Sequence, residues 1–111
     1  MAEEAPLPTS DPEVVRFARA SGLLTFTDEG PRDAPALVAV HGIPGSVRDF
    51  RYLAPQVSGA LRVVRLDLPG FGGSTPEAFG VGSFDGRVRA VLELADHLGL
   101  AQFAVLGHSM G

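Results

Sequence analysis

The sequence predicts an α/β fold with a mostly parallel sheet, in which a β-hairpin is followed by strand, helix, strand, helix and strand. Segments of strand length that are rich in apolar residues recur at 36–40, 61–66 and 102–106, and segments of helical periodicity separate them. The first of these runs, Ala-Leu-Val-Ala-Val, is apolar throughout, as expected for a parallel strand covered on both faces. A chain of 111 residues fits one domain.

The first twelve residues are predicted to form a mobile N-terminal tail. Pro6, Pro8 and Pro12 oppose regular structure there. The single domain is therefore expected to occupy residues 13–111.

Residues 13–19 allow two interpretations. Ser10 and Glu13 have capping-box spacing, which would start a helix. Apolar and polar residues alternate in this segment, however, the turn signal Ser21-Gly22 follows, and residues 24–27 alternate again. This pattern favours a β-hairpin.

Two helices are expected between the later strands. The first is short, starts at about Val47, is bent or shortened by Pro55 and ends at Gly59. Its expected apolar face is Phe50, Leu53, Ala54 and Val57. The second follows a long glycine-rich loop, is capped by Ser83 and ends at Gly99. Its expected apolar face is Phe84, Val88, Val91, Leu92, Ala95 and Leu98.

Composition excludes several classes of function. The net charge is −4, which disfavours a nucleic-acid partner because phosphate binding needs a cationic surface. Every basic residue is an arginine, so Schiff-base and phosphate-loop lysines are excluded, and the lack of cysteine excludes disulfides and thiolate nucleophiles. The N-terminus does not resemble a secretory signal, and no apolar run approaches the roughly 18 residues of a membrane span. We therefore expect a cytoplasmic protein with no membrane partner.

The strongest chemical signal is Gly107-His108-Ser109-Met110-Gly111, which matches the motif G-x-S-x-G and directly follows a predicted strand. In that motif the serine lies on a tight, strained strand-to-helix turn. The flanking positions are glycine because side chains there would collide. The turn would expose the Ser109 hydroxyl above the sheet, where a histidine can remove its proton.

Two more glycine-rich turns follow the two earlier parallel strands. The segment 41–46 reads His-Gly-Ile-Pro-Gly-Ser, and its glycines would let a backbone N–H point at a developing oxyanion. It could equally be an ordinary turn in which Ser46 caps a helix. The segment 67–74 reads Asp-Leu-Pro-Gly-Phe-Gly-Gly-Ser. A dinucleotide motif fails there because Thr75 stands where the third glycine is needed, and a phosphate loop would need a lysine.

Taken together, H-G-x-P-G-S, D-x-P-G-x-G-x-S and G-H-S-M-G, each after a strand and in this order, resemble the α/β-hydrolase family. The similarity is to its serine branch, which includes esterases, lipases, haloperoxidase-like enzymes and carbon–carbon-bond hydrolases. It extends over about residues 14–111. It implies a partial α/β-hydrolase fold in which the strand before Ile43 neighbours the strand before Ser109.

The resemblance also implies roles for individual residues. Ser109 corresponds to the nucleophile, and the backbone N–H groups of Ile43 and Met110 to the oxyanion hole. Gly42, Gly107 and Gly111 correspond to the glycines of the loop and the elbow. Relatives that open epoxides or displace halide carry aspartate at the nucleophile position, so the serine disfavours those two reactions.

The family's triad acid and histidine follow the nucleophile in chain order. Neither is present in these 111 residues, so residues 13–111 are interpreted as the truncated N-terminal part of one α/β-hydrolase domain. We expect this fragment to be inactive. Its last strand, Gln102–Leu106, would be an apolar sheet edge.

The other polar residues receive structural interpretations. His108 is not expected to reach the Ser109 hydroxyl, because neighbouring side chains on a tight turn point in different directions. His41 is expected to support the oxyanion loop by hydrogen bonding. His97 is expected to have a structural role near a helix end. The histidines lack ligand spacing, so neither a metal nor another cofactor is expected. Asp67 is expected to shape its loop. The arginines of the strands are expected to face solvent: Arg16, Arg19, Arg62 and Arg65.

The function that follows is a serine hydrolase acting on an ester or related carbonyl substrate, a small molecule, through an acyl-enzyme. The alternative is a non-enzymatic use of the same fold for binding or interaction. The sequence does not specify the substrate or the oligomeric state.

Overall fold

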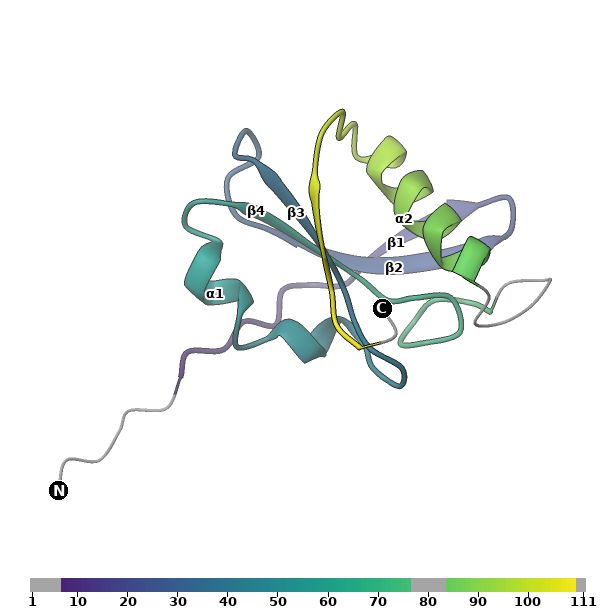
Figure 1. Ribbon diagram of the computed structural model, residues 1–111, viewed down its shortest axis with the longest axis horizontal. Helices are drawn as coiled ribbons and strands as arrows, with labels where there is room; N and C mark the ends of the chain where they lie inside the picture. The colour runs from purple at the N-terminus through teal and green to yellow at the C-terminus, as the bar shows by residue number, and fades with distance from the viewer. Residues whose placement is uncertain (1–6, 77–83, 110–111) are drawn as a thin grey trace, which may run out of the picture.

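A computed structural model describes residues 7–76 and 84–109, which form a five-stranded sheet with helices packed on it (Figure 1). The strands are β1 (Val15–Arg19), β2 (Gly22–Glu29), β3 (Ala36–Val40), β4 (Arg62–Leu66) and β5 (Ala104–Gly107). The helices are the 3₁₀-helix η1 (Val47–Phe50) and the α-helices α1 (Ala54–Val57) and α2 (Phe84–His97).

The sheet has the strand order β1-β2-β4-β3-β5. β1 and β2 form an antiparallel hairpin that starts the sheet, and β2 is antiparallel to β4. β3 is parallel to both β4 and β5. The predicted hairpin and the parallel β-α-β-α-β arrangement are thus confirmed, and residues 13–19 contain no helix.

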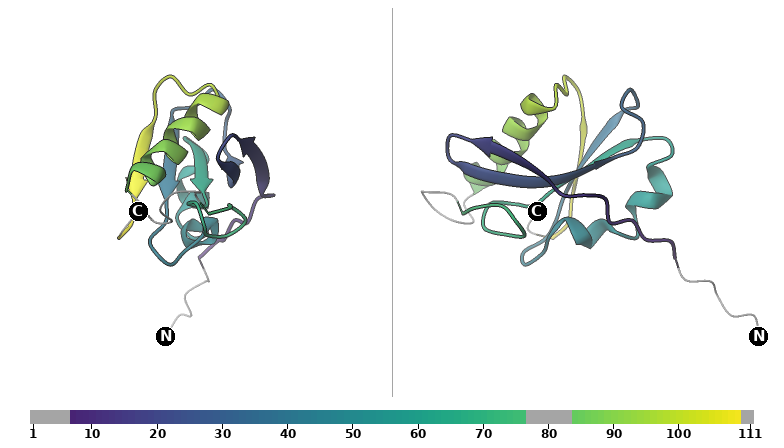
Figure 2. Two further views of the ribbon diagram at one scale, coloured as in Figure 1. Left: turned by 90° about the vertical axis from the view of Figure 1, so that its right-hand side faces the viewer. Right: turned by 180° about the vertical axis from the view of Figure 1, so that it is seen from behind.

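The two faces of the sheet differ in chemistry because side chains alternate along each strand. Even-numbered residues of β2, β3 and β4 form the apolar core under α2, which lies along one side of the sheet (Figure 2). The core residues from the strands are Leu24, Phe26, Val38, Val40, Val64 and Leu66. The opposite face carries buried polar side chains, namely Thr25 and Thr27 of β2 and Arg65 of β4.

The first predicted helix is two short helices. Pro55 lies at the start of α1, where its missing N–H costs nothing, and so it begins a helix instead of bending one. The expected buried face is therefore wrong at Leu53, which is 40% exposed between the two helices.

The predicted apolar face of α2 is also wrong in part. Phe84, Val88 and Leu92 are 74%, 41% and 56% exposed, whereas Ala90 and Leu94 are fully buried. The small Ala90 allows the helix backbone to approach the sheet, and this rotates the larger side chains outwards. They line an apolar groove of about 340 Å³ beside β5. The predicted cap, Ser83, lies outside the described residues.

Three of the four arginines expected to face solvent are largely buried. Arg65 is 1% exposed, and the side chains of Arg19 and Arg62 are 3% and 11% exposed. Each forms an ion pair, with Glu29, Glu93 and Asp28 respectively. A buried charge needs a partner of opposite charge, and each of these three arginines has one.

The N-terminal segment is attached to the fold, and the last strand is an edge strand. Residues 7–14 carry no regular structure, but Ser10 is attached to the body of the protein because its N–H donates to the carbonyl of Arg51. β5 lies at the edge of the sheet, as predicted, and Val105 on it is 56% exposed. In the parts described, no helix is both long and apolar enough to cross a membrane.

Candidate active site

The three glycine-rich turns follow β3, β4 and β5, whose carboxyl ends lie at one edge of the sheet. Backbone and side-chain hydrogen bonds join the turns. The N–H of His108 donates to the carbonyl of Val40 over 3.1 Å, and the N–H of Leu68 donates to Nε2 of His41 over 2.9 Å. The motifs that the sequence places up to 68 residues apart, from His41 to Ser109, thus form one site.

Ser109 has a φ of 59°, and no other non-glycine residue in the described part of the chain has a positive φ. This conformation is unfavourable for an L-amino acid and is found where the surroundings impose it. Ser109 is exposed directly after β5. The strained, exposed serine predicted from the elbow motif is therefore observed.

Gly42 brings the first turn against the elbow. A Cβ atom at Gly42 would lie 3.1 Å from Cβ of Ser109, 3.1 Å from the carbonyl oxygen of His108 and 3.2 Å from its Nδ1. Only a residue without a side chain allows this approach without displacement. The sheet order, which pairs Val40 with Gly107, produces the contact.

His41 is fully buried between the first two turns. Because Nε2 accepts the N–H of Leu68, the ring proton is assigned to Nδ1, which donates to the carbonyl oxygen of Gly42 over 2.6 Å. The carbonyl and the following N–H of a trans peptide point in opposite directions, so this bond also orients the N–H of Ile43. His41 supports the turn after β3 by these two bonds, and neither ring nitrogen is free to act as a base.

Asp67 ties the second turn to its neighbours. Its Oδ1 accepts the N–H of Val47 over 2.8 Å, and its Oδ2 accepts the hydroxyl of Thr25 over 2.6 Å. Gly72, with a φ of 53°, lies directly against this carboxylate. Asp67 is 2% exposed and all its contacts are to the fold, which agrees with its expected role in shaping the loop.

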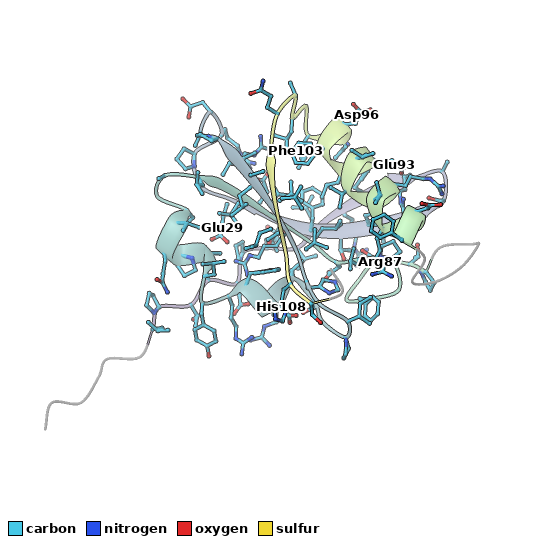
Figure 3. All side chains as sticks on the ribbon, viewed as in Figure 1. Glu29, Arg87, Glu93, Asp96, Phe103 and His108 are labelled. Atoms are coloured by element: carbon cyan, nitrogen blue, oxygen red, sulfur yellow. The ribbon has the colours of Figure 1, made fainter. Side chains whose placement is uncertain are left out.

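The remaining site residues divide between the described and undescribed parts of the chain. Gly107 is the last residue of β5, and Ile43 is half-buried against the core. Met110 and Gly111 lie outside the described residues, so the second oxyanion donor and the last elbow glycine stay predictions. His108 is exposed at the end of β5 (Figure 3).

His97, the last residue of α2, lies where that helix contacts the β1–β2 hairpin. Its ring stacks on Phe17 at a centroid distance of 4.0 Å and meets Phe26 edge-on at 6.4 Å. These contacts attach the end of α2 to β1 and β2, which agrees with the structural role expected for it.

A charged cluster outside the site joins β2 and β4. In it, Asp28 of β2 accepts two hydrogen bonds from Arg62 of β4. Burial alone would raise the pKa of Asp28, but the hydrogen bonds and charges of Arg62 and Arg32 outweigh burial and hold that pKa below its ordinary value. The same bonds raise the pKa of Arg62. Within the described ranges, no three histidine, aspartate or glutamate side chains converge as a metal site.

Two polar residues of the site region were not singled out as partners by the sequence. The sequence predicts Thr25 only as an alternating strand residue and Arg65 as a solvent-facing charge. The one available signal for Arg65 is its position between the apolar residues Val63, Val64 and Leu66 of a predicted strand.

The sheet order, the strained serine after β5 and the two supporting turns define a protein of the α/β-hydrolase type. The family model of the alpha/beta hydrolase fold matches residues 35–111, and the chain belongs to this family.

Individual relatives extend the comparison. The chain is 38% identical over 89 residues to the dihydrolipoyllysine-residue acetyltransferase component of an acetoin cleaving system from Pseudomonas putida, covering 80% of this chain and 24% of that protein. It is 37% identical over 84 residues to the magnesium-chelatase 30 kDa subunit of Rhodobacter capsulatus, covering 76% and 30%. A metagenomic epoxide hydrolase of known structure superposes with a TM-score of 0.81 at 34% identity, covering 89% and 34%. The chain spans about a quarter to a third of the length of these proteins.

Proposed function

We propose that Ser109 is the nucleophile of a serine hydrolase that cleaves an ester or related carbonyl compound through an acyl-enzyme. The hydroxyl of Ser109 attacks the substrate carbonyl, and the N–H groups of Ile43 and Met110 stabilise the oxyanion that forms. The reaction also needs a histidine and an acid that follow Ser109 in the full-length protein, in the order that the family resemblance implies.

The observation that carries this proposal is the positive φ of Ser109 at the end of a parallel strand, in contact with Gly42. Such a backbone conformation is uncommon for a serine, and residues that adopt it cluster at active sites. The orientation of the Ile43 N–H through His41 is a second support, since a prearranged donor is what a developing oxyanion requires.

Similarity to an epoxide hydrolase raises the question of which reaction this site supports. The resemblance stated above associates epoxide opening and halide displacement with an aspartate nucleophile. Serine at position 109 therefore favours acyl transfer. The small-molecule class of substrate follows from the same chemistry, and the cytoplasmic location expected from the sequence stays a prediction.

The proposal is tested in the full-length protein by replacing Ser109 with alanine. Hydrolysis of short-chain aryl esters should fall by at least about a thousandfold, and covalent labelling by a fluorophosphonate should disappear. Ser58→Ala is the matched control, because Ser58 follows α1 beside the loop after β2 and should leave both signals unchanged.

Two results would contradict the proposal. One is a folded wild-type protein that neither turns over esters nor reacts with the phosphonate, which would favour the non-enzymatic alternative. The other is a labelled adduct on a residue other than Ser109, found by peptide mass spectrometry.

A further inference from the structure

The two backbone polar groups of Val47, the first residue of η1, are held by one side chain of β4 and one of the turn that follows it. Its N–H donates to Oδ1 of Asp67 over 2.8 Å, and its carbonyl accepts from Nη1 of Arg65 over 3.1 Å. Arg65 lies on β4 and Asp67 follows the last residue of that strand, and both side chains reach Val47 on the same side of the sheet. Together they fix both the position and the direction of the chain at Val47.

Val47 is connected to the oxyanion loop through a segment that has little freedom. Ser46 caps η1 by accepting the N–H of Arg48 at 3.1 Å, and Asp49 accepts the N–H of Ser46 in return. A Cβ atom at Gly45 would lie 2.5 Å from the carbonyl oxygen of Gly42, so the loop is folded tightly on itself. A displacement of Val47 is therefore passed on to the Gly42–Ile43 peptide.

Arg65 is held in turn by the N-terminal segment and by β2. Its Nη2 donates to the carbonyl of Ser10 over 3.0 Å and pairs with Oε1 of Glu29. The hydroxyl of Ser10 donates to Oε2 of the same carboxylate over 2.6 Å. Figure 3 shows Glu29 on the side of the sheet near α1. Because a guanidinium with 1% exposure needs a partner for its charge, Ser10 and Glu29 are part of what keeps Arg65 in place.

We propose that Arg65 is a positioning residue for the oxyanion loop: with Asp67 it clamps Val47, and the segment around Ser10 closes that clamp. The expected effect of Arg65 on catalysis rests on the proposed function. Its effect on the position of Val47 rests on the hydrogen bonds alone. A simple contribution to stability is the competing explanation, and the ion pair of Arg62 with Asp28 provides the comparison. Arg62 lies on the same strand and binds a carboxylate through two hydrogen bonds, but its described bonds go to Asp28 and not to the loop.

The test compares Arg65→Met with Arg62→Met in the full-length protein. Arg65→Met should lower kcat for an aryl ester by about ten- to a hundredfold and leave KM within about twofold, because misplacing a catalytic group affects the transition state most. Arg62→Met should leave both constants within about twofold. Equal kcat values for the two variants would overturn the proposal.

A milder pair of variants covers the case in which Arg65→Met does not fold. Glu29→Gln preserves the shape of the side chain but removes the charge that holds Arg65, and should lower kcat about three- to tenfold. Asp28→Asn, the neighbouring carboxylate on β2, should not. An unchanged kcat in folded Glu29→Gln would refute the role of the clamp.

Amide hydrogen exchange separates this inference from the proposed function. The N–H of Val47 should exchange at least about tenfold faster in Glu29→Gln than in Asp28→Asn, whether or not Ser109 is a nucleophile. A protein without ester turnover that shows this difference has the clamp but not the proposed activity. A protein with turnover but equal exchange rates has the activity without the clamp.

Discussion

The contact between Gly42 and the elbow gives the sharpest prediction, through the substitution Gly42→Ala. Gly42 does not have a positive φ, so its backbone accepts alanine and the effect of the change is steric alone. The new Cβ would lie 3.1 Å from Cβ of Ser109, whereas unstrained carbon atoms stay about 3.5 Å apart or more. The elbow and the oxyanion loop must therefore separate by about 0.4 Å, the difference between these two distances.

The kinetic effect follows from this displacement. A misplacement of about 1 Å costs about a hundredfold in rate, and if the free energy scales with distance, 0.4 Å costs about sixfold. That factor corresponds to about 1 kcal/mol of transition-state stabilisation. The loss should appear in kcat for an aryl ester, measured in the full-length protein, with KM little changed.

Gly59→Ala is the control for the prediction at Gly42. A Cβ at Gly59 meets no atom within 4 Å, and its backbone also lacks a positive φ. Gly59→Ala should therefore retain wild-type kcat and unfolding temperature. If Gly42→Ala is as active as Gly59→Ala, the two turns do not meet as described and the assignment of the oxyanion loop is wrong.

Two further predictions concern stability, measured by denaturant unfolding of the full-length protein. The pKa of Asp28 is lowered in the folded state, so its contribution to stability is present above its unfolded value near 3.8 and is lost as the pH falls through the lower folded value. Arg62→Met should reduce this acid-sensitive contribution and leave the part that Arg32 supplies, and a variant with unchanged acid sensitivity would contradict the stated cause. Leu94→Ala should lower the free energy of unfolding by about 2–5 kcal/mol because Leu94 is fully buried, whereas Leu92→Ala, at 56% exposure, should lower it by less than about 1 kcal/mol. Equal losses would mean that α2 packs on the sheet through the apolar face predicted from the sequence.

The sequence was sufficient where local patterns determine the structure. Three largely apolar strands, each followed by a glycine-rich turn and separated by helical segments, predicted the parallel sheet. The glycine-rich turns mark where each strand ends. The elbow motif likewise predicted the strain at Ser109, because its glycines mark positions where a tight turn leaves no room for a side chain.

The sequence was insufficient where tertiary packing decides. The helical pattern of α2 contains enough apolar residues for two possible faces, and the small Ala90 determines which one approaches the sheet. The partners of Arg65 could not be identified from the sequence because Glu29 and Ser10 are 36 and 55 residues away in the chain. Only the fold brings these groups together, and no spacing rule connects them.

The order of the supporting residues has a consequence for biosynthesis. Every described group that contacts the elbow or holds its neighbouring turns, from Ser10 through Gly42 to Asp67, precedes Ser109 in the chain. A ribosome makes the chain from the N-terminus, at about 5–20 residues per second, so these groups have left the exit tunnel several seconds before the serine does. The elbow is thus the last part of this arrangement to be synthesised, and its strained conformation is imposed on it by neighbours that are already available when it emerges.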